Sequence, residues 1–146
     1  MKMTAVEPVF VDTNILLAAT DVSRDKHAEA TRFLSFSKAQ LLLSGQVLRE
    51  YLVVATRPVE VNGLGMRPTD ALGNAAQLQA RCRLLEETSD VLKILCQLVS
   101  TLNLKGKRIH DANIAAVMIT HGVHRLATLN PKDFGAFEGF TLVSIE

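Results

Sequence analysis

Short apolar runs alternate with longer amphipathic stretches along this chain. The runs at 9–11 and 41–43 are continuous and bounded by polar residues, which is typical of buried strands. Further segments at 84–85, 125–128 and 140–145 complete a set of five predicted strands, the last of them at an edge of the sheet. Strands that alternate with helices indicate an α/β fold with a mainly parallel central sheet flanked by helices.

Between these runs, apolar residues recur at the spacing of a helix face. The helices predicted in this way cover about 15–20, 24–37, 44–57, 68–82, 88–102 and 110–122. Residues 58–67 include an Asn-Gly pair and predict a loop, and residues 1–7 predict a short, frayed terminus. No repeat, linker or low-complexity segment interrupts the pattern, so residues 1–146 are predicted to form a single domain.

The composition narrows the class of protein. At 146 residues the chain is long enough for one domain with a sizeable core. Apolar residues make up 48% of it and charged residues 21%, which is ordinary for a globular protein. The formal net charge of +1 gives no overall signature of nucleic-acid binding. Any contact with nucleic acid must therefore come from a local cluster of basic residues.

Two further features concern location. Cys82 and Cys96 lack the spacing of a metal site, and both lie in apolar stretches, so we expect two buried free thiols. The chain opens without a signal-peptide pattern, and no apolar run approaches the length of a membrane span. The sequence therefore predicts a cytoplasmic protein without a membrane partner.

Asp12 stands at the end of the first predicted strand and is followed by Thr13 and Asn14. In open α/β sheets, ligands bind in the crevice at the carboxyl ends of the strands, which makes Asp12 a candidate ligand-binding residue. The same residue types are also ordinary helix caps that stabilise a helix by about 1 kcal/mol. This motif alone does not decide between a cap and a site.

Two further acids lie on predicted apolar helix faces. Glu50 is three residues after Val47 and four before Val54, and Asp111 is three residues before Ile114. The structural alternative for Glu50 is a position at the rim of the core. The alternative for Asp111 is a first-turn position that the helix dipole favours.

The last polar cluster follows the strand predicted at 125–128, where Asn130 and Asp133 lie in a turn. Each of these acids has an ordinary explanation when it is taken singly. Together, carboxylates at strand ends and on apolar faces are costly to desolvate unless something neutralises them. A divalent cation with oxygen ligands removes this cost, and Mg²⁺ or Mn²⁺ is the natural match.

Five short segments form a pattern that is specific in combination, although no single segment is. They are Val-Phe-Val-Asp-Thr-Asn at 9–14, Leu-Arg-Glu-Tyr at 48–51, Ala-Thr-Arg-Pro at 55–58, His-Asp-Ala-Asn-Ile-Ala-Ala at 110–116 and Leu-Ala-Thr-Leu-Asn-Pro-Lys-Asp-Phe at 126–134. In this order they span nearly the whole chain. They resemble the PIN-domain family of metal-dependent ribonucleases, and most closely the VapC-type toxins of bacterial toxin–antitoxin pairs.

The resemblance implies one PIN-like domain in which Asp12, Glu50 and Asp111 are the catalytic, metal-binding acids. It also implies that Thr13 or Asn14 shapes the site around Asp12. The expected cofactor is Mg²⁺ or Mn²⁺. The expected reaction is hydrolysis of an RNA phosphodiester by a water that the metal activates.

The last segment departs from the family pattern at one position. Many relatives carry Asp two residues after the strand-end threonine, which is Thr128 here, and this chain has Asn130 at that place. Asp133 matches a second acid of the motif and is expected to supply the fourth carboxylate, directly or through water. Thr128 and Asn130 are expected to contact the metal ligands and hold them in place without binding the metal themselves.

The expected partners follow from the same resemblance. They are an RNA substrate with unpaired bases, a small antitoxin protein and a second copy of the chain. The antitoxin is expected to lay an apolar segment near Phe33 and Phe36. The candidates for contacting RNA phosphates, each of which is also ordinary in a solvated loop, are Arg57, Lys105, Lys107, Arg108 and Lys132.

Two other classes of function remain open at this point. A PIN-like module that binds RNA or protein without cutting is favoured by Asn130 and opposed by Asp12, Glu50 and Asp111. A protein that is phosphorylated on Asp12 would also carry an acid after its first strand. Such proteins need a second acid that this chain lacks, either earlier in the sequence or at Asn14.

Overall fold

The structure is a computed structural model and describes residues 6–146, so most of the terminus predicted at 1–7 lies outside the described residues. The described chain forms a five-stranded sheet in the order β3-β2-β1-β4-β5, and all four strand pairings are parallel. This confirms the predicted α/β class and the edge position of the last strand. The strands are β1 (Val9–Val11), β2 (Leu41–Ser44), β3 (Arg83–Leu85), β4 (Arg125–Ala127) and β5 (Thr141–Val143).

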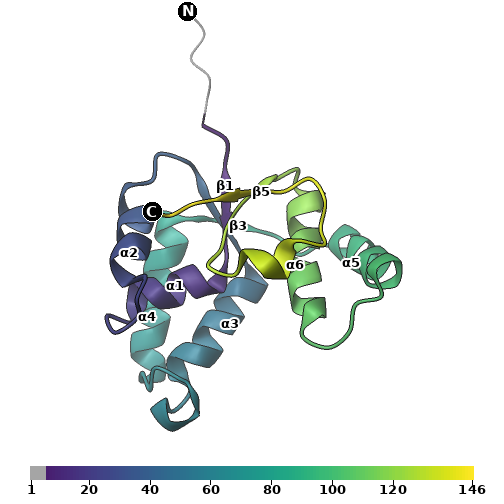
Figure 1. The fold of residues 1–146 in the computed structure, drawn as a ribbon. Helices are drawn as coiled ribbons and strands as arrows, with labels where there is room; N and C mark the ends of the chain where they lie inside the picture. Colours follow the sequence, from purple (N-terminus) through teal and green to yellow (C-terminus); the bar gives the residue numbers. More distant parts are fainter. Residues whose placement is uncertain (1–5) are drawn as a thin grey trace, which may run out of the picture.

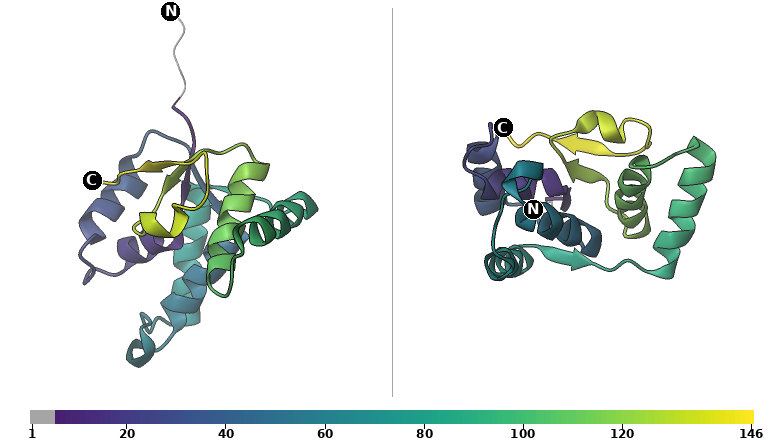
Figure 2. Two further views of the ribbon diagram at one scale, coloured as in Figure 1. Left: turned by 45° about the vertical axis from the view of Figure 1, so that its right-hand side comes forward. Right: turned by 90° about the horizontal axis from the view of Figure 1, so that it is seen from below.

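Helices cover both sides of this sheet. Helices α1, α2 and α4 gather on one side and α5 and α6 stand together on the other, with the strands between the two groups (Figures 1 and 2). Helix α3 packs against α1 and α4. The bounds are α1 (Thr13–Thr20), α2 (His27–Phe36), α3 (Gly45–Thr56), α4 (Pro68–Arg81), α5 (Ser89–Leu102) and α6 (Arg108–Thr120), with 3₁₀ turns η1 (Val59–Val61) and η2 (Pro131–Phe134).

Strand β1 is the centre of the core. All three of its residues are buried, and β2 and β4 flank it. A parallel sheet that is covered on both faces buries the side chains on both sides of each strand. This explains why its central strands read as continuous apolar runs instead of alternating ones.

The strand order reverses beside β1, because β2 and β3 lie on one side of it and β4 and β5 on the other. Such a switch point is where open α/β sheets form their ligand crevice. Asp12 directly follows β1, Thr128 directly follows β4, and α3 begins at Gly45 directly after β2. The amide of Asp12 donates to the carbonyl of Ala127 at 3.0 Å, which joins β1 to β4 at this edge.

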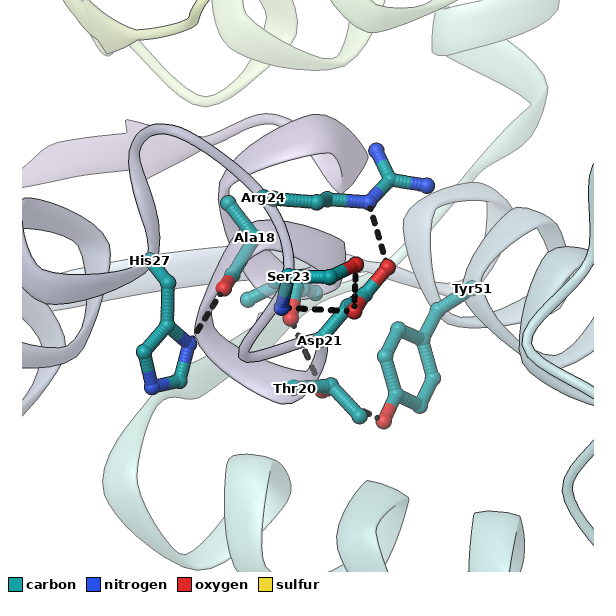
Figure 3. A network of polar contacts seen from close by, with 8 residues as sticks. Ala18, Thr20, Asp21, Ser23, Arg24, His27 and Tyr51 are labelled. Carbon is teal, nitrogen blue, oxygen red and sulfur yellow. Dashed lines mark hydrogen bonds and ion pairs between the residues drawn. The ribbon is translucent and has the colours of Figure 1, made fainter.

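Hydrogen bonds of Tyr51 with Thr20 and Asn74, called the polar brace below, join three helices, and Figure 3 shows the contact of Tyr51 with Thr20. The hydroxyls of Thr20 and Tyr51 share a hydrogen bond of 2.9 Å, and the amide of Asn74 donates to Tyr51 at 3.3 Å, so α1, α3 and α4 are tied at one point. After α1, the Asp21 carboxylate accepts hydrogen bonds from the backbone and the hydroxyl of Ser23. This contact closes a turn between α1 and α2.

Several elements begin or end up to three residues away from their predicted bounds. The helix predicted from residue 24 begins at His27, because the turn at Asp21 occupies the residues before it. The helix predicted from residue 110 begins at Arg108, and the predicted loop contains the short turn η1.

The cysteine prediction is correct for one residue only. Cys82 is buried as expected, but the expectation for Cys96 is wrong, because this residue is exposed. Helix α5 packs onto α6 along one side, and Cys96 lies on the side that faces water. Among residues 6–146, no helix is both long enough and apolar enough to cross a membrane.

Candidate active site

An open cavity of about 620 Å³ lies where the carboxyl ends of the central strands meet α3 and α6. It brings together eight of the residues that the sequence singled out, and their chemical roles stay predictions. The residues that line it are Asp12, Thr13, Asn14, Leu17, Arg49, Glu50, Val53, Val54, Arg57, His110, Asp111, Asn130 and Asp133.

Asp12 is both the N-cap of α1 and a wall of this cavity. The backbone amide of Thr13 donates to one carboxylate oxygen at 2.8 Å, and the hydroxyl of Thr128 donates to the other at 2.8 Å. Burial raises the pKa of Asp12, the two hydrogen bonds lower it in part, and the nearby Glu50 and Asp133 carboxylates raise it further. The cap and the site are therefore one feature, and they do not exclude each other.

Glu50 projects into the cavity from α3. One of its oxygens accepts from the hydroxyl of Thr13 at 3.1 Å, and the other accepts from the side-chain amide of Gln46 at 2.9 Å. Thr13 thus contacts two of the predicted acids, with its amide on Asp12 and its hydroxyl on Glu50. The resemblance assigns Thr13 a supporting role in a metal site, and that role stays a prediction.

Asp111 lies in the first turn of α6 and its side chain is 24% exposed. Burial is the main cause that raises its pKa to about 6, and the carboxylates of Asp133 and Asp12 add to this shift. The guanidinium of Arg108 stands 4.0 Å away and acts in the opposite direction. The other acids of the cavity therefore affect the pKa of Asp111, so Asp111 belongs to the same electrostatic group.

Thr128 holds together the loop that brings Asp133 to the cavity. Its hydroxyl accepts from the side-chain amide of Asn14 at 3.2 Å and from the backbone amide of Asn130 at 3.1 Å. Asn14 in turn accepts from the amide of Leu129 at 3.1 Å. Asp133 follows in η2 and is exposed at the rim of the cavity.

The acids of this cavity suit a divalent cation in their chemistry. Four carboxylates face one space, and burial, with the neighbouring carboxylates as a smaller cause, raises the pKa of Asp12 and of Asp111. Oxygen ligands of this kind are those that Mg²⁺ and Mn²⁺ prefer. Within residues 6–146, however, no three His, Cys, Asp or Glu side chains stand close enough to hold one ion as they are placed.

The structure places only some of the predicted phosphate-binding residues at or beside the cavity. Arg57 lines the cavity, and Lys132 lines a neighbouring hollow together with Asn130 and Asp133. Arg108 is drawn to Asp111. Lys105 and Lys107 are exposed beside α6 and do not line this cavity.

Sequence reasoning missed two residues of the site. Arg49 lines the cavity beside Glu50, and its place in the Leu-Arg-Glu-Tyr segment was a usable signal. Gln46 stands four residues before Glu50 and so lies on the same helix face, which could have marked it as a partner.

Comparison with known proteins gives the same picture of the chain. A family model described as PIN domain matches residues 9–137. Ribonuclease VapC24 of Mycobacterium tuberculosis (strain CDC 1551 / Oshkosh) is 30% identical to this chain over 139 residues. That alignment covers 91% of this chain and 92% of that protein.

Solved structures share the fold at lower identity. The crystal structure of Mycobacterium tuberculosis VapC20, described as a Sarcin-Ricin loop cleaving toxin, superposes with a TM-score of 0.73 at 23% identity and covers 91% of this chain and 96% of that one. The structure of VapBC2 from Rickettsia felis, bound to a DNA fragment from their promoter, has a TM-score of 0.69 at 17% identity and covers 93% and 97%.

Proposed function

This chain belongs to the PIN-domain family, and we propose that it is a metal-dependent endoribonuclease that hydrolyses RNA phosphodiester bonds. The observation that carries the proposal is the meeting of Asp12, Glu50, Asp111 and Asp133 at one cavity. A relative that covers nearly the whole chain is named a ribonuclease, which supports the same reaction class.

The four acids would hold the cofactor, for which we propose Mg²⁺ or Mn²⁺. When bound, such a cation activates a water as the nucleophile and offsets the charge that develops on the phosphate oxygens. Thr13 and Thr128 donate to different oxygens of Asp12, so each oxygen keeps acceptor capacity for a ligand. Glu50 is held in the same way by Thr13 and Gln46.

The substrate would be held by the cations at the rim. Arg49 and Arg57 line the cavity and would contact phosphates of the RNA there. Lys132, beside Asp133, would extend this contact. Binding through such contacts is expected to weaken as salt is added.

The biological role we propose is that of a toxin whose partner is a small antitoxin. The structural relatives include a toxin–antitoxin complex from Klebsiella pneumoniae, which supports this assignment. On this chain, Phe36 of α2 is 79% exposed and Phe33 beside it is partly buried, which suits an apolar segment of a partner. The homodimer and the cytoplasmic location that the sequence predicts belong to the same proposal.

The alternative is a PIN-like module that binds without cutting. Its support is Asn130, which lines the cavity as an amide where many relatives have an acid. Asn130 uses its backbone amide to hold the hydroxyl of Thr128, so its structural role is independent of a charge.

RNA cleavage by the purified full-length chain decides between the two. We expect a broad pool of single-stranded RNA to be cut with Mg²⁺ or Mn²⁺, to stay intact with EDTA, and to be cut at least 100-fold more slowly by Asp12→Asn. The matched control is Asp90→Asn, which changes an exposed acid in the first turn of α5. RNA that stays intact with both metals, while the protein still binds it, would favour the module.

A further inference from the structure

A line of hydrogen bonds runs from the surface to Glu50 through two amide side chains. The amide nitrogen of Asn113 donates to the Gln46 side-chain oxygen at 2.6 Å and lies 3.4 Å from the Glu87 carboxylate. The amide nitrogen of Gln46 donates to Glu50 at 2.9 Å and to the backbone oxygen of His110 at 2.9 Å. The other oxygen of Glu87 accepts the backbone amide of Gln46 at 3.0 Å.

The burial of Gln46 is explained by its hydrogen bonds and not by packing of apolar surface. Gln46 is one of three buried polar residues within 6–146, and it is 4% exposed. A buried amide without partners is unfavourable, because it loses its hydrogen bonds to water and gains none in return. Here the oxygen has one partner and the nitrogen has two. An apolar residue, like the neighbouring Val47 and Leu48, would fill a buried helix position without this requirement.

The chemistry of the hydrogen-bond partners determines how the two side-chain amides of this line are oriented. The Glu87 carboxylate and the His110 carbonyl can only accept, so the groups that face them are donors. The side-chain nitrogen of Asn113 therefore donates a hydrogen bond to Gln46, and the side-chain oxygen of Gln46 accepts it. This turns the nitrogen of Gln46 towards Glu50, where it holds the carboxylate oxygen that Thr13 does not.

The line also connects separate elements of the fold. Gln46 and Glu50 belong to α3, His110 and Asn113 belong to α6, and Glu87 lies between β3 and α5. The carbonyl that Gln46 binds comes directly before Asp111 in the chain. Gln46 thus contacts one predicted metal ligand directly and the backbone beside another.

We propose that Gln46, oriented by Asn113 and Glu87, is a positioning residue that sets the direction of the Glu50 carboxylate and its spacing from Asp111. The inference rests on the proposed function in one respect, namely that these acids hold a divalent cation. It predicts that loss of either amide weakens metal binding although neither touches the metal.

The test is Mn²⁺ binding by titration calorimetry on the full-length chain. Gln46→Met and Asn113→Leu remove the amides without adding charge, and Gln79→Met makes the same change at an exposed position on α4. Residues that orient metal ligands typically change metal affinity 10- to 100-fold. We therefore expect Kd for Mn²⁺ to rise at least tenfold in the first two variants and to stay within twofold in Gln79→Met.

The double variant separates positioning from general damage to the fold. If Asn113 acts through Gln46, then Gln46→Met with Asn113→Leu binds Mn²⁺ about as weakly as Gln46→Met alone. The Mn²⁺ concentration for half-maximal RNA cleavage is expected to rise in parallel, with the rate at saturating Mn²⁺ largely restored. Unfolding midpoints in EDTA identify any variant that does not fold, and Asn113→Leu, at a half-buried position, keeps the test valid if Gln46→Met fails.

Two results would overturn the inference. One is a folded Asn113→Leu or Gln46→Met protein that binds Mn²⁺ within twofold of the parent chain. The other is a parent chain that binds no Mn²⁺. A parent chain that binds Mn²⁺ but cuts no RNA contradicts the proposed function alone, because the binding data still test the role of Gln46.

Discussion

Thr128 holds Asp12, which directly follows β1, and the start of the loop that leads to Asp133 in η2. Its hydroxyl donates to Asp12 and accepts from Asn14 and from the Asn130 amide. Valine has nearly the same shape and makes none of these bonds. One small hydroxyl therefore provides a hydrogen-bond partner for three polar groups.

We expect Thr128→Val to lower the free energy of unfolding by about 1 to 3 kcal/mol, because donors that are left without an acceptor lose their solvation without compensation. Urea unfolding measures this change. The matched control is Thr120→Val, whose hydroxyl only donates back to the carbonyl of Ala116 four residues earlier, and it is expected to cost much less. Equal losses in both variants would contradict a special role for Thr128.

Asp111 gives the site a dependence on pH. Its pKa is raised to about 6 from the 3.8 of a free side chain, so the folded protein binds this proton more tightly than the unfolded one. The resulting stabilisation is complete below about pH 4 and is lost as pH rises through 6. Asp12 acts in the same direction, and Arg108 opposes the shift in Asp111.

In EDTA, we expect Asp111→Asn to raise the free energy of unfolding at pH 7 by about 1 to 3 kcal/mol, because it removes a carboxylate that burial and like charges disfavour. Urea unfolding at pH 5 and pH 7 should show that the difference from the parent chain shrinks at the lower pH. Asp90→Asn, on an exposed side chain, is the matched control. A destabilised Asp111→Asn protein at pH 7 would contradict the assignment.

At the scale of elements, the polar brace around Tyr51 sets how α1 and α3 meet. Tyr51 is the neighbour of Glu50 in the chain but is completely buried, and it binds Thr20 and Asn74. Adjacent residues on a helix point in different directions, so α3 uses one residue for its packing and the next for the site.

We expect Tyr51→Phe to lower the free energy of unfolding by about 1 kcal/mol through loss of the buried hydroxyl contacts. Its affinity for Mn²⁺ should stay within threefold of the parent chain, because the aromatic ring keeps α1 and α3 apart as before. Urea unfolding and titration calorimetry measure the two quantities. A tenfold loss of affinity at unchanged stability would mean that the brace positions the acids directly.

Sequence patterns predicted the elements well wherever the signal was local. Short apolar segments predicted all five strands, and the two continuous runs belong to β1 and β2, whose residues are all buried. The start of α2 was misplaced because the turn at Asp21 depends on contacts that helical spacing does not encode. The contact of Gln46 with His110 was not predictable from local spacing, because the two residues lie 64 positions apart in the sequence.

At the scale of the whole molecule, the order of the strands assembles the candidate site. No local pattern states that β1 lies between β2 and β4, yet this order brings Asp12 beside Thr128. The grouping of the four acids was predictable only through the family pattern. Their chemical roles stay predictions until metal binding is measured.

We expect Mn²⁺ to stabilise the whole fold, since a ligand that binds only the folded chain adds about 2.7 kcal/mol at one hundred times its Kd. Thermal unfolding with Mn²⁺ and with EDTA measures the shift, which should be small in Asp12→Asn and unchanged in Gln79→Met. An identical unfolding midpoint of the parent chain under both conditions would contradict a metal site that is tied to folding.

The pairing of β1 with β4 also has a consequence for when the protein acquires its chemistry. Asp12 and the hydroxyl that holds it are 116 residues apart, so a chain emerging from the ribosome exposes the acid long before its partner exists. Contacts between distant segments close late in folding because the intervening loop must first lose its entropy. A nascent chain that ends before residue 125 carries three of the four acids without the strand that aligns them. Under the proposed function, the chain therefore gains its activity only after β4 and Thr128 have been synthesised.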